Sequence, residues 1–128
     1  MMQSLRSRPV LAVLGAAVVV TIPHLLSQGG QEKLGERFAY LAIPFGFALT
    51  AGVLGMALRS VWAAVGIHGG LHVANTPVSE PGLSVDGPAQ WILIGALFTL
   101  LAVLIGLRLP RERWVEVRDR GPCARALS

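Results

Sequence analysis

The chain has 128 residues, 53% hydrophobic and only 14% charged, with a net charge of +4 and a mean hydropathy of +0.61. A soluble domain usually carries about 25% charged residues, and here the charges gather at the ends of apolar runs. This distribution argues against a soluble globular enzyme, a disordered chain and a nucleic-acid-binding protein. The single cysteine, Cys123, excludes a disulfide within the chain.

Four stretches lack Asp, Glu, Lys and Arg over about the 20 residues that a membrane-spanning helix needs. None of them shows the alternation of apolar and polar residues that is typical of barrel strands. The sequence therefore predicts an all-α, polytopic membrane protein, a bundle of about four transmembrane helices. The predicted spans are residues 9–27, 38–58, 60–77 and 89–107.

The arginines predict the orientation, because basic residues gather on the cytoplasmic side of a membrane. With both termini cytoplasmic, the inner side holds nine arginines and the outer side holds only Lys33 and Arg37. We therefore expect an integral protein of the cytoplasmic membrane. Residues 1–108 form its transmembrane domain, and residues 109–128 form a basic cytoplasmic tail that lies on membrane lipids without binding nucleic acid.

Small residues four apart predict faces where helices pack closely, as is common in membrane proteins. One such face falls in the predicted third helix and two in the second. The three patterns are Ala48-x-x-x-Gly52, Ala51-x-x-x-Gly55 and Gly66-x-x-x-Gly70.

Histidines are the ionisable residues inside the predicted spans that carry a functional hypothesis, because such groups are costly at membrane depth. His68 and His72 are four residues apart and Asn75 follows three later, so all three share one helix face. The first and third helices run parallel, which allows His24 to meet this face. Such histidines bind zinc, bind haem or act as general bases. A structural hydrogen bond is an equally good interpretation of His24 alone.

A longer pattern carries a family resemblance. Residues 45–75, FGFALTAGVLGMALRSVWAAVGIHGGLHVAN, place a helix rich in small residues, then Ser60 and Trp62, ahead of His68. This resembles the C-terminal half of the CAAX prenyl protease (type II) and bacteriocin-processing family, the CPBP or Abi intramembrane proteases. The family's F-x-x-x-H motif corresponds to residues 20–24, with Val20 in the place of Phe. The resemblance covers about residues 3 to 108.

The resemblance implies that His24 and His68 are catalytic. His72 stands where the family has Asn or Asp, and Asn75 follows one turn later. The family's first motif, E-E-x-x-x-R, is absent, so we expect an N-terminally truncated member of the family.

The implied activity is an intramembrane endopeptidase that hydrolyses membrane-associated or lipidated proteins or peptides. In that mechanism a glutamate activates water and His24 holds the water. His68, with His72 or Asn75, stabilises the oxyanion. His24 and His68 are also the candidate ligands of a divalent metal such as zinc. Two alternatives stay open: a catalytically inactive, immunity-type remnant that binds a membrane partner, and a haem protein with His24 and His72 as axial ligands.

Overall fold

A computed structural model describes residues 8–26, 33–75 and 87–122, with only the backbone described for 71–75. Every regular element in these residues is a helix, which confirms the predicted all-α class. Short turns or segments outside the description join the helices. In chain order they are α1 (Pro9–Thr21), the 3-10 turn η1 (Ile22–Leu25), α2 (Leu34–Tyr40), α3 (Ala42–Leu58), α4 (Val61–Asn75), α5 (Pro88–Arg108) and α6 (Arg111–Arg120).

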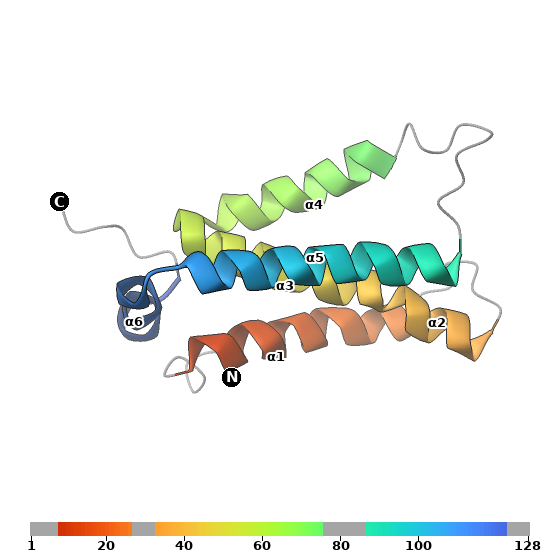
Figure 1. The fold of residues 1–128 in the computed structure, drawn as a ribbon, viewed down its shortest axis with the longest axis horizontal. Coiled ribbons are helices and arrows are strands. Elements are labelled where there is room, and N and C mark those ends of the chain that lie inside the picture. Colours follow the sequence, from red (N-terminus) through yellow and green to blue (C-terminus); the bar gives the residue numbers. More distant parts are fainter. Residues whose placement is uncertain (1–7, 27–32, 76–86, 123–128) are drawn as a thin grey trace.

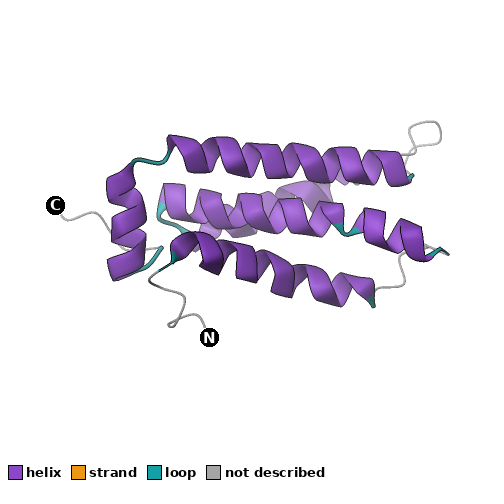
Figure 2. Cartoon of the chain, turned by 60° about the horizontal axis from the view of Figure 1, so that its bottom comes forward, coloured by secondary structure: helices purple, strands orange, loops and turns teal. Residues whose placement is uncertain are grey.

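Helix α3 is the centre of the bundle, and α1, α4 and α5 pack against it from different sides (Figures 1 and 2). Helices α1 and α4 run in one direction along the bundle, whereas α3 and α5 run in the other. Helix α6 lies across the end of the bundle where α3 and α5 finish and α1 and α4 begin (Figure 1). The described chain therefore starts and finishes at the same end.

Two of the predicted spans coincide with helices long and apolar enough to cross a membrane, the 25-residue α2–α3 segment Leu34–Leu58 and the 21-residue α5. Helix α5 leaves most of its apolar side chains exposed, unlike the core helix of a soluble protein. The other two predicted spans are shorter in the structure. Helix α1 has 13 residues and continues through η1 to Leu25, and α4 has 15 residues.

Helices α3 and α5 approach closely because two glycines face each other. A Cβ on Gly46 would lie 2.3 Å from the Gly95 carbonyl oxygen, and a Cβ on Gly95 would lie 2.3 Å from the Ala42 carbonyl group. Between the helices, the fully buried Thr50 hydroxyl donates to the Phe98 carbonyl oxygen at 2.7 Å. This contact joins a side chain to the backbone of the neighbouring helix, which apolar packing alone does not achieve.

The predicted small-residue patterns have different outcomes. Gly52 packs against α1, since its Cβ would lie 3.1 Å from Val13, which agrees with a packing role. A Cβ on Gly66 or Gly70 would meet nothing within 4 Å, so that pattern packs against no other described residue. The close contact between α3 and α5 instead uses Gly46 and Gly95. Each belongs to a small-residue pattern of its own helix, Ala42-x-x-x-Gly46 and Gly95-x-x-x-Thr99, but neither pattern shows that the two glycines pair.

The turn between α3 and α4 is formed by Arg59 and Ser60. Arg59 ends α3 in the left-handed conformation, with φ 54° and ψ 32°. Glycine adopts this conformation at little cost, whereas an arginine needs a compensating interaction. The Arg59 side chain has one, because it pairs with Glu116 of α6.

Candidate functional site

His68 lies midway along α4 and contacts α3 through a buried aromatic ring. The His68 and Phe47 ring centroids are 5.4 Å apart in an edge-to-face arrangement, and Phe47 meets Phe98 of α5 at 5.7 Å. Contacts of this geometry contribute about 0.5–1.5 kcal/mol beyond the area they bury. This aromatic row joins α4 to α3 at the level of His68, while the His68 side chain keeps contact with the exterior.

His24 lies in η1, just beyond the α-helical part of α1. Its Nδ1 is 2.9 Å from the Val20 carbonyl oxygen, so Nδ1 donates and Nε2 of the neutral ring carries a lone pair. The bond orients the ring, as second partners of catalytic or metal-binding histidines commonly do. The same contact is also the structural hydrogen bond that the sequence offers as an alternative for His24.

The structure does not bring His24 and His68 together. Helices α1 and α4 flank α3 on different sides, and both views of the fold agree on this separation (Figures 1 and 2). Among the described residues no three His, Cys, Asp or Glu side chains come close enough to hold a metal ion. A zinc site with the three protein ligands that catalysis normally uses does not fit this donor set.

The remaining predicted site residues are placed only in part. His72 and Asn75 belong to α4, but their side chains lie outside the described residues, as does the whole of Cys123. The common face predicted for His68, His72 and Asn75 is consistent with the helical backbone over Val61–Asn75.

One face of α3 lies between the contacts with α1 and α4. Successive helical residues turn by about 100°, so Ala48, Ala51 and Gly55 share a face between Gly52, which meets α1, and Phe47, which meets α4. Among the described residues, the one atom that would come within 4 Å of a Cβ on Gly55 is the Ser60 carbonyl oxygen, at 3.6 Å. The helices with the two histidines thus flank a surface of small side chains, the kind that admits another helix closely.

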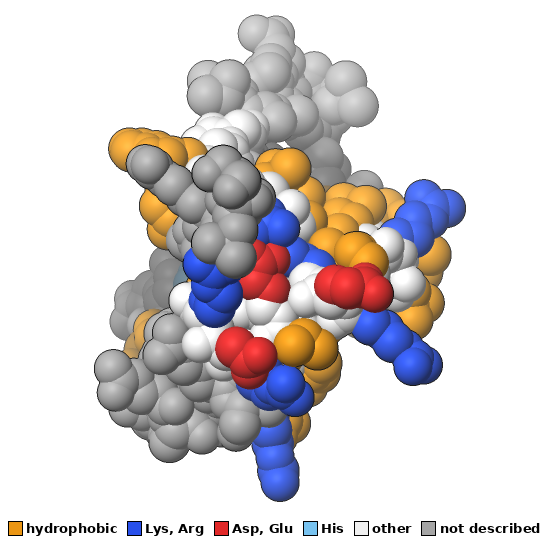
Figure 3. Space-filling model, turned by 90° about the vertical axis from the view of Figure 1, so that its left-hand side faces the viewer, with side chains coloured by type: hydrophobic (Ala, Val, Ile, Leu, Met, Phe, Trp, Pro, Cys, Tyr) orange, Lys and Arg blue, Asp and Glu red, His pale blue; other side chains and the backbone are white. Residues whose placement is uncertain are grey.

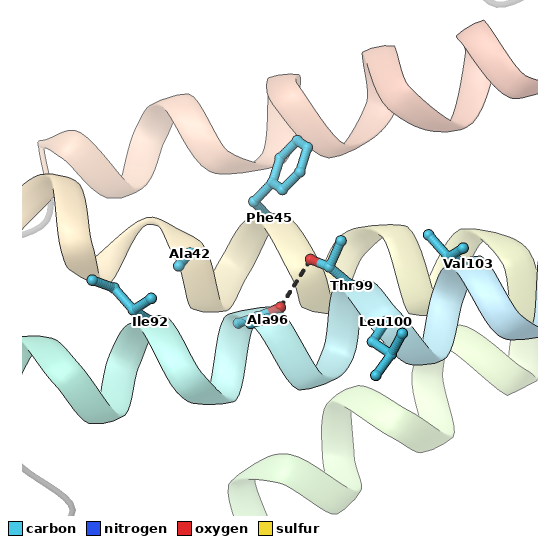
Figure 4. Close-up of a pocket in the computed structure, with 8 residues that line it drawn as sticks. Ala42, Phe45, Ile92, Ala96, Thr99, Leu100 and Val103 are labelled. Carbon is cyan, nitrogen blue, oxygen red and sulfur yellow. Dashed lines mark hydrogen bonds between the residues drawn. The ribbon is translucent and has the colours of Figure 1, made fainter.

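A separate apolar hollow lies between α3 and α5 on the outside of the bundle (Figure 4). Its one hydroxyl, on Thr99, already donates to the Gly95 carbonyl oxygen at 2.8 Å. The hollow therefore fits an apolar chain and presents no free polar group for catalysis. Its lining residues are Ala42, Phe45, Ile92, Gly95, Ala96, Thr99, Leu100 and Val103.

The sequence did not reveal a polar cluster that holds α6 against the end of α3. Arg113 is buried, with 5% of its surface exposed, and its Nε donates to the Met56 carbonyl oxygen at 2.7 Å. Its guanidinium also bonds the Glu116 carboxylate at 2.7 Å and the Pro122 carbonyl, and Glu116 pairs with Arg59. We call Arg59, Arg113 and Glu116 the arginine clasp.

The clasp explains the charge state of its carboxylate. The hydrogen bond from Arg113 lowers the pKa of Glu116, burial opposes this in part, and Arg59 lowers it further. The acid therefore stays ionised at neutral pH. The basic composition of residues 109–128 predicts a tail on the lipid surface, and only the 3.6-residue period that places Trp114 and Val117 on one face indicates packing against the bundle.

No family model, no curated protein and no solved structure matches the chain. The resemblance to CPBP proteases therefore stays a prediction from the motifs around His24 and His68.

Proposed function

We propose that the protein is an integral protein of the cytoplasmic membrane whose four apolar helices α1, α2–α3, α4 and α5 all cross the bilayer. The sorting of charge supports this. Within the described chain, no Asp, Glu, Lys or Arg occurs in residues 9–26, 38–58, 60–75 or 88–107. The 21 residues of α5 span about 31 Å, close to the thickness of the hydrocarbon layer.

The same sorting supports an orientation with both ends of the chain in the cytoplasm. The end that carries α6 holds seven of the described arginines and three acids, whereas the opposite end holds Lys33, Glu36 and Arg37. By the positive-inside rule the α6 end faces the cytoplasm. Cysteine accessibility in intact cells tests the assignment: a cysteine at Lys33 should react with an impermeant reagent and one at Arg111 should not.

Within the membrane, we propose an endopeptidase of the CAAX-protease type, completed by a carboxylate on a further helix. One observation carries this proposal: α1 and α4 begin at the same end and flank the small-residue face of α3. A helix seated on Ala48, Ala51 and Gly55 would lie between the helices that bear His24 and His68. Its carboxylate would take the proton of the attacking water, His24 would orient the water, and His68 would donate to the oxyanion.

The test uses membranes that contain the full chain, with a farnesylated peptide ending in a C-a-a-X sequence as the probe. We expect cleavage, with a loss of about a hundredfold or more for His68→Ala, as for the removal of an oxyanion donor. Lys33→Gln, at the far end of the bundle, serves as the control and should cleave normally. Equal cleavage by wild type and His68→Ala, or no cleavage by wild type, would refute the catalytic proposal.

A second candidate is a non-catalytic, partner-binding membrane protein. The separation of His24 from His68 by α3 favours it, because a binding surface needs no convergence of the two histidines. The test is cross-linking from Ala51→Cys in a Cys123→Ser background. An adduct with a membrane protein in a chain that cleaves nothing would support this candidate, and a position that remains unlinked would count against it.

The haem alternative gains less support. Axial ligation by His24 and His72 needs α1 and α4 side by side, whereas α3 lies between them. A purified protein without a Soret absorption band would exclude it.

A further inference from the structure

The arginines at the α6 end divide into two groups. Arg59 and Arg113 belong to the clasp, and Arg118 pairs with its neighbour Asp119 at 2.9 Å. Arg8, Arg108, Arg111 and Arg120 are exposed, and their side chains form no hydrogen bond or ion pair with any other described residue. We call these four the rim arginines, because they come from the beginning of α1, the end of α5 and the two ends of α6.

Most of the described acids at this end are paired with arginines. Glu116 lies in the clasp and Asp119 pairs with Arg118, which leaves Glu112 as the exposed acid of α6 with no ion pair to the described residues. Figure 3 looks onto this end and shows basic side chains projecting outward from its edge, with acidic side chains nearer the middle. Two of the three described acids at this end are thus paired, Glu116 in the clasp and Asp119 with Arg118, and the four rim arginines outnumber the one unpaired acid, Glu112.

The rim borders directly on apolar surface. Leu107, next to Arg108, is 78% exposed, and Leu104, one turn earlier on α5, is 44% exposed. Val115 on the outer face of α6 is 45% exposed. A cation above bare aliphatic side chains matches a phospholipid, which has a phosphate above acyl chains. A free phosphate would use the arginines alone.

We propose that the corner between α5 and α6, with Arg108 and Arg111 at its centre and Arg8 and Arg120 adding to the field, binds the headgroups of anionic phospholipids. The proposal rests on the membrane insertion proposed above. An arginine fork matches phosphate oxygens in pairs and is less strongly hydrated than lysine, so it suits the boundary between headgroups and hydrocarbon. Each basic residue near an anionic surface favours binding about fivefold.

The experiment measures quenching of tryptophan fluorescence by brominated lipids in proteoliposomes. Trp114 is the reporter, in a Trp62→Phe/Trp91→Phe background, because its ring packs beside Gly106, two residues before Arg108. Brominated phosphatidylglycerol should quench Trp114 with a relative association constant several-fold above that of brominated phosphatidylcholine. The preference should fall to about one in Arg108→Gln/Arg111→Gln, remain in Arg108→Lys/Arg111→Lys, and persist in Lys33→Gln.

The outcomes separate the two proposals. In a protein with Trp91 alone, quenching by neither lipid would refute membrane insertion itself. Quenching by both lipids without preference at Trp114, or a preference that survives Arg108→Gln/Arg111→Gln, would refute the lipid site while leaving insertion intact. A preference that inorganic phosphate abolishes and chloride of equal ionic strength does not would assign the corner to free phosphate instead.

Discussion

Helix α3 meets α5 and α4 in two different ways. Against α5 the backbones touch through Gly46 and Gly95, and Thr50 bonds across to the Phe98 carbonyl oxygen. Against α4 the link is the ring contact between Phe47 and His68, and α4 diverges from α3 toward its own C-terminal end (Figure 1). One interface leaves no space for an added methyl group, whereas the glycines of the other helix have open space beside them.

This contrast distinguishes α3 and α5, which form a tightly packed structural pair, from α4, whose surface is available for other contacts. Membrane helices gain little from burying apolar surface against one another, so they depend on close packing and polar bonds. The α3–α5 pair has both. In the part of α4 whose side chains are described, a Cβ on Gly66, Gly69 or Gly70 would meet no atom within 4 Å, and the same helix carries His68. The helix with the candidate chemistry is thus the one whose small-residue surface remains open.

Filling the tight interface should have the largest effect. Gly95→Leu places a side chain against the Ala42 backbone, and we expect destabilisation of at least about 3 kcal/mol or loss of folded protein. Gly66→Leu is the matched control, with open space beside it and better helix propensity, and should change stability by less than about 1 kcal/mol. Unfolding in mixed detergent micelles measures both. Equal effects at the two positions would remove the contrast between the interfaces.

The arginine clasp adds a third kind of interface, since it joins α3 to α6 by charge. Arg113→Ala removes the guanidinium that bonds the Met56 carbonyl and one side of Glu116, which keeps Arg59 as a partner, and we expect a loss of about 2 kcal/mol. Arg118→Ala on the same helix removes an exposed pair and should cost no more than about 0.5 kcal/mol. The same unfolding assay compares them. A similar small loss in both variants would mean that α6 is held by packing alone.

The polar part of the α3–α5 contact is tested by Thr50→Val, which keeps the shape and removes the hydroxyl. We expect a loss of about 1 kcal/mol, the usual size of an interhelical hydrogen bond in a membrane protein. Thr99→Val removes a hydroxyl that bonds only its own helix and should have a smaller effect. A larger loss for Thr99→Val would show that the bond to Phe98 does not stabilise the pair.

The smallest expected effect is the response of the clasp to acid. The pKa of Glu116 lies below its ordinary value of 4.5 in the folded protein, so its contribution is complete above that value and is lost as pH falls through the folded pKa. The unfolding midpoint should therefore be flat from about pH 8 to pH 5 on account of this group and decline in stronger acid. Glu116→Gln should remove that part of the decline, and an unchanged profile would exclude the carboxylate as its source.

The apolar runs were sufficient to predict the all-α class and the positions of the four apolar helices, whereas the basic helix α6 and the division between α2 and α3 were not predicted. The runs could not predict the pairing of Gly46 with Gly95, since two residues on separate helices share no spacing. The clasp was hidden for a related reason: the helical period places Arg113 on the face of Val117, but it does not show that this face packs on α3 or that Arg59 and Glu116 meet there. The predicted meeting of His24 with the α4 histidines relied on equal depth and parallel direction. Depth and direction fix how far along the bundle axis a residue lies, but they do not fix on which side of α3 its helix packs.

The left-handed residue between α3 and α4 connects α6 mechanically to α4. Arg59 ends α3, begins the turn into α4, and shares Glu116 with Arg113. His68 lies roughly 13 Å along α4 from that turn, so a tilt of about 10° there would move its ring by roughly 2 Å. A change that shifts α6 would therefore be transmitted through Arg59 to the angle of α4, and so to the position of His68.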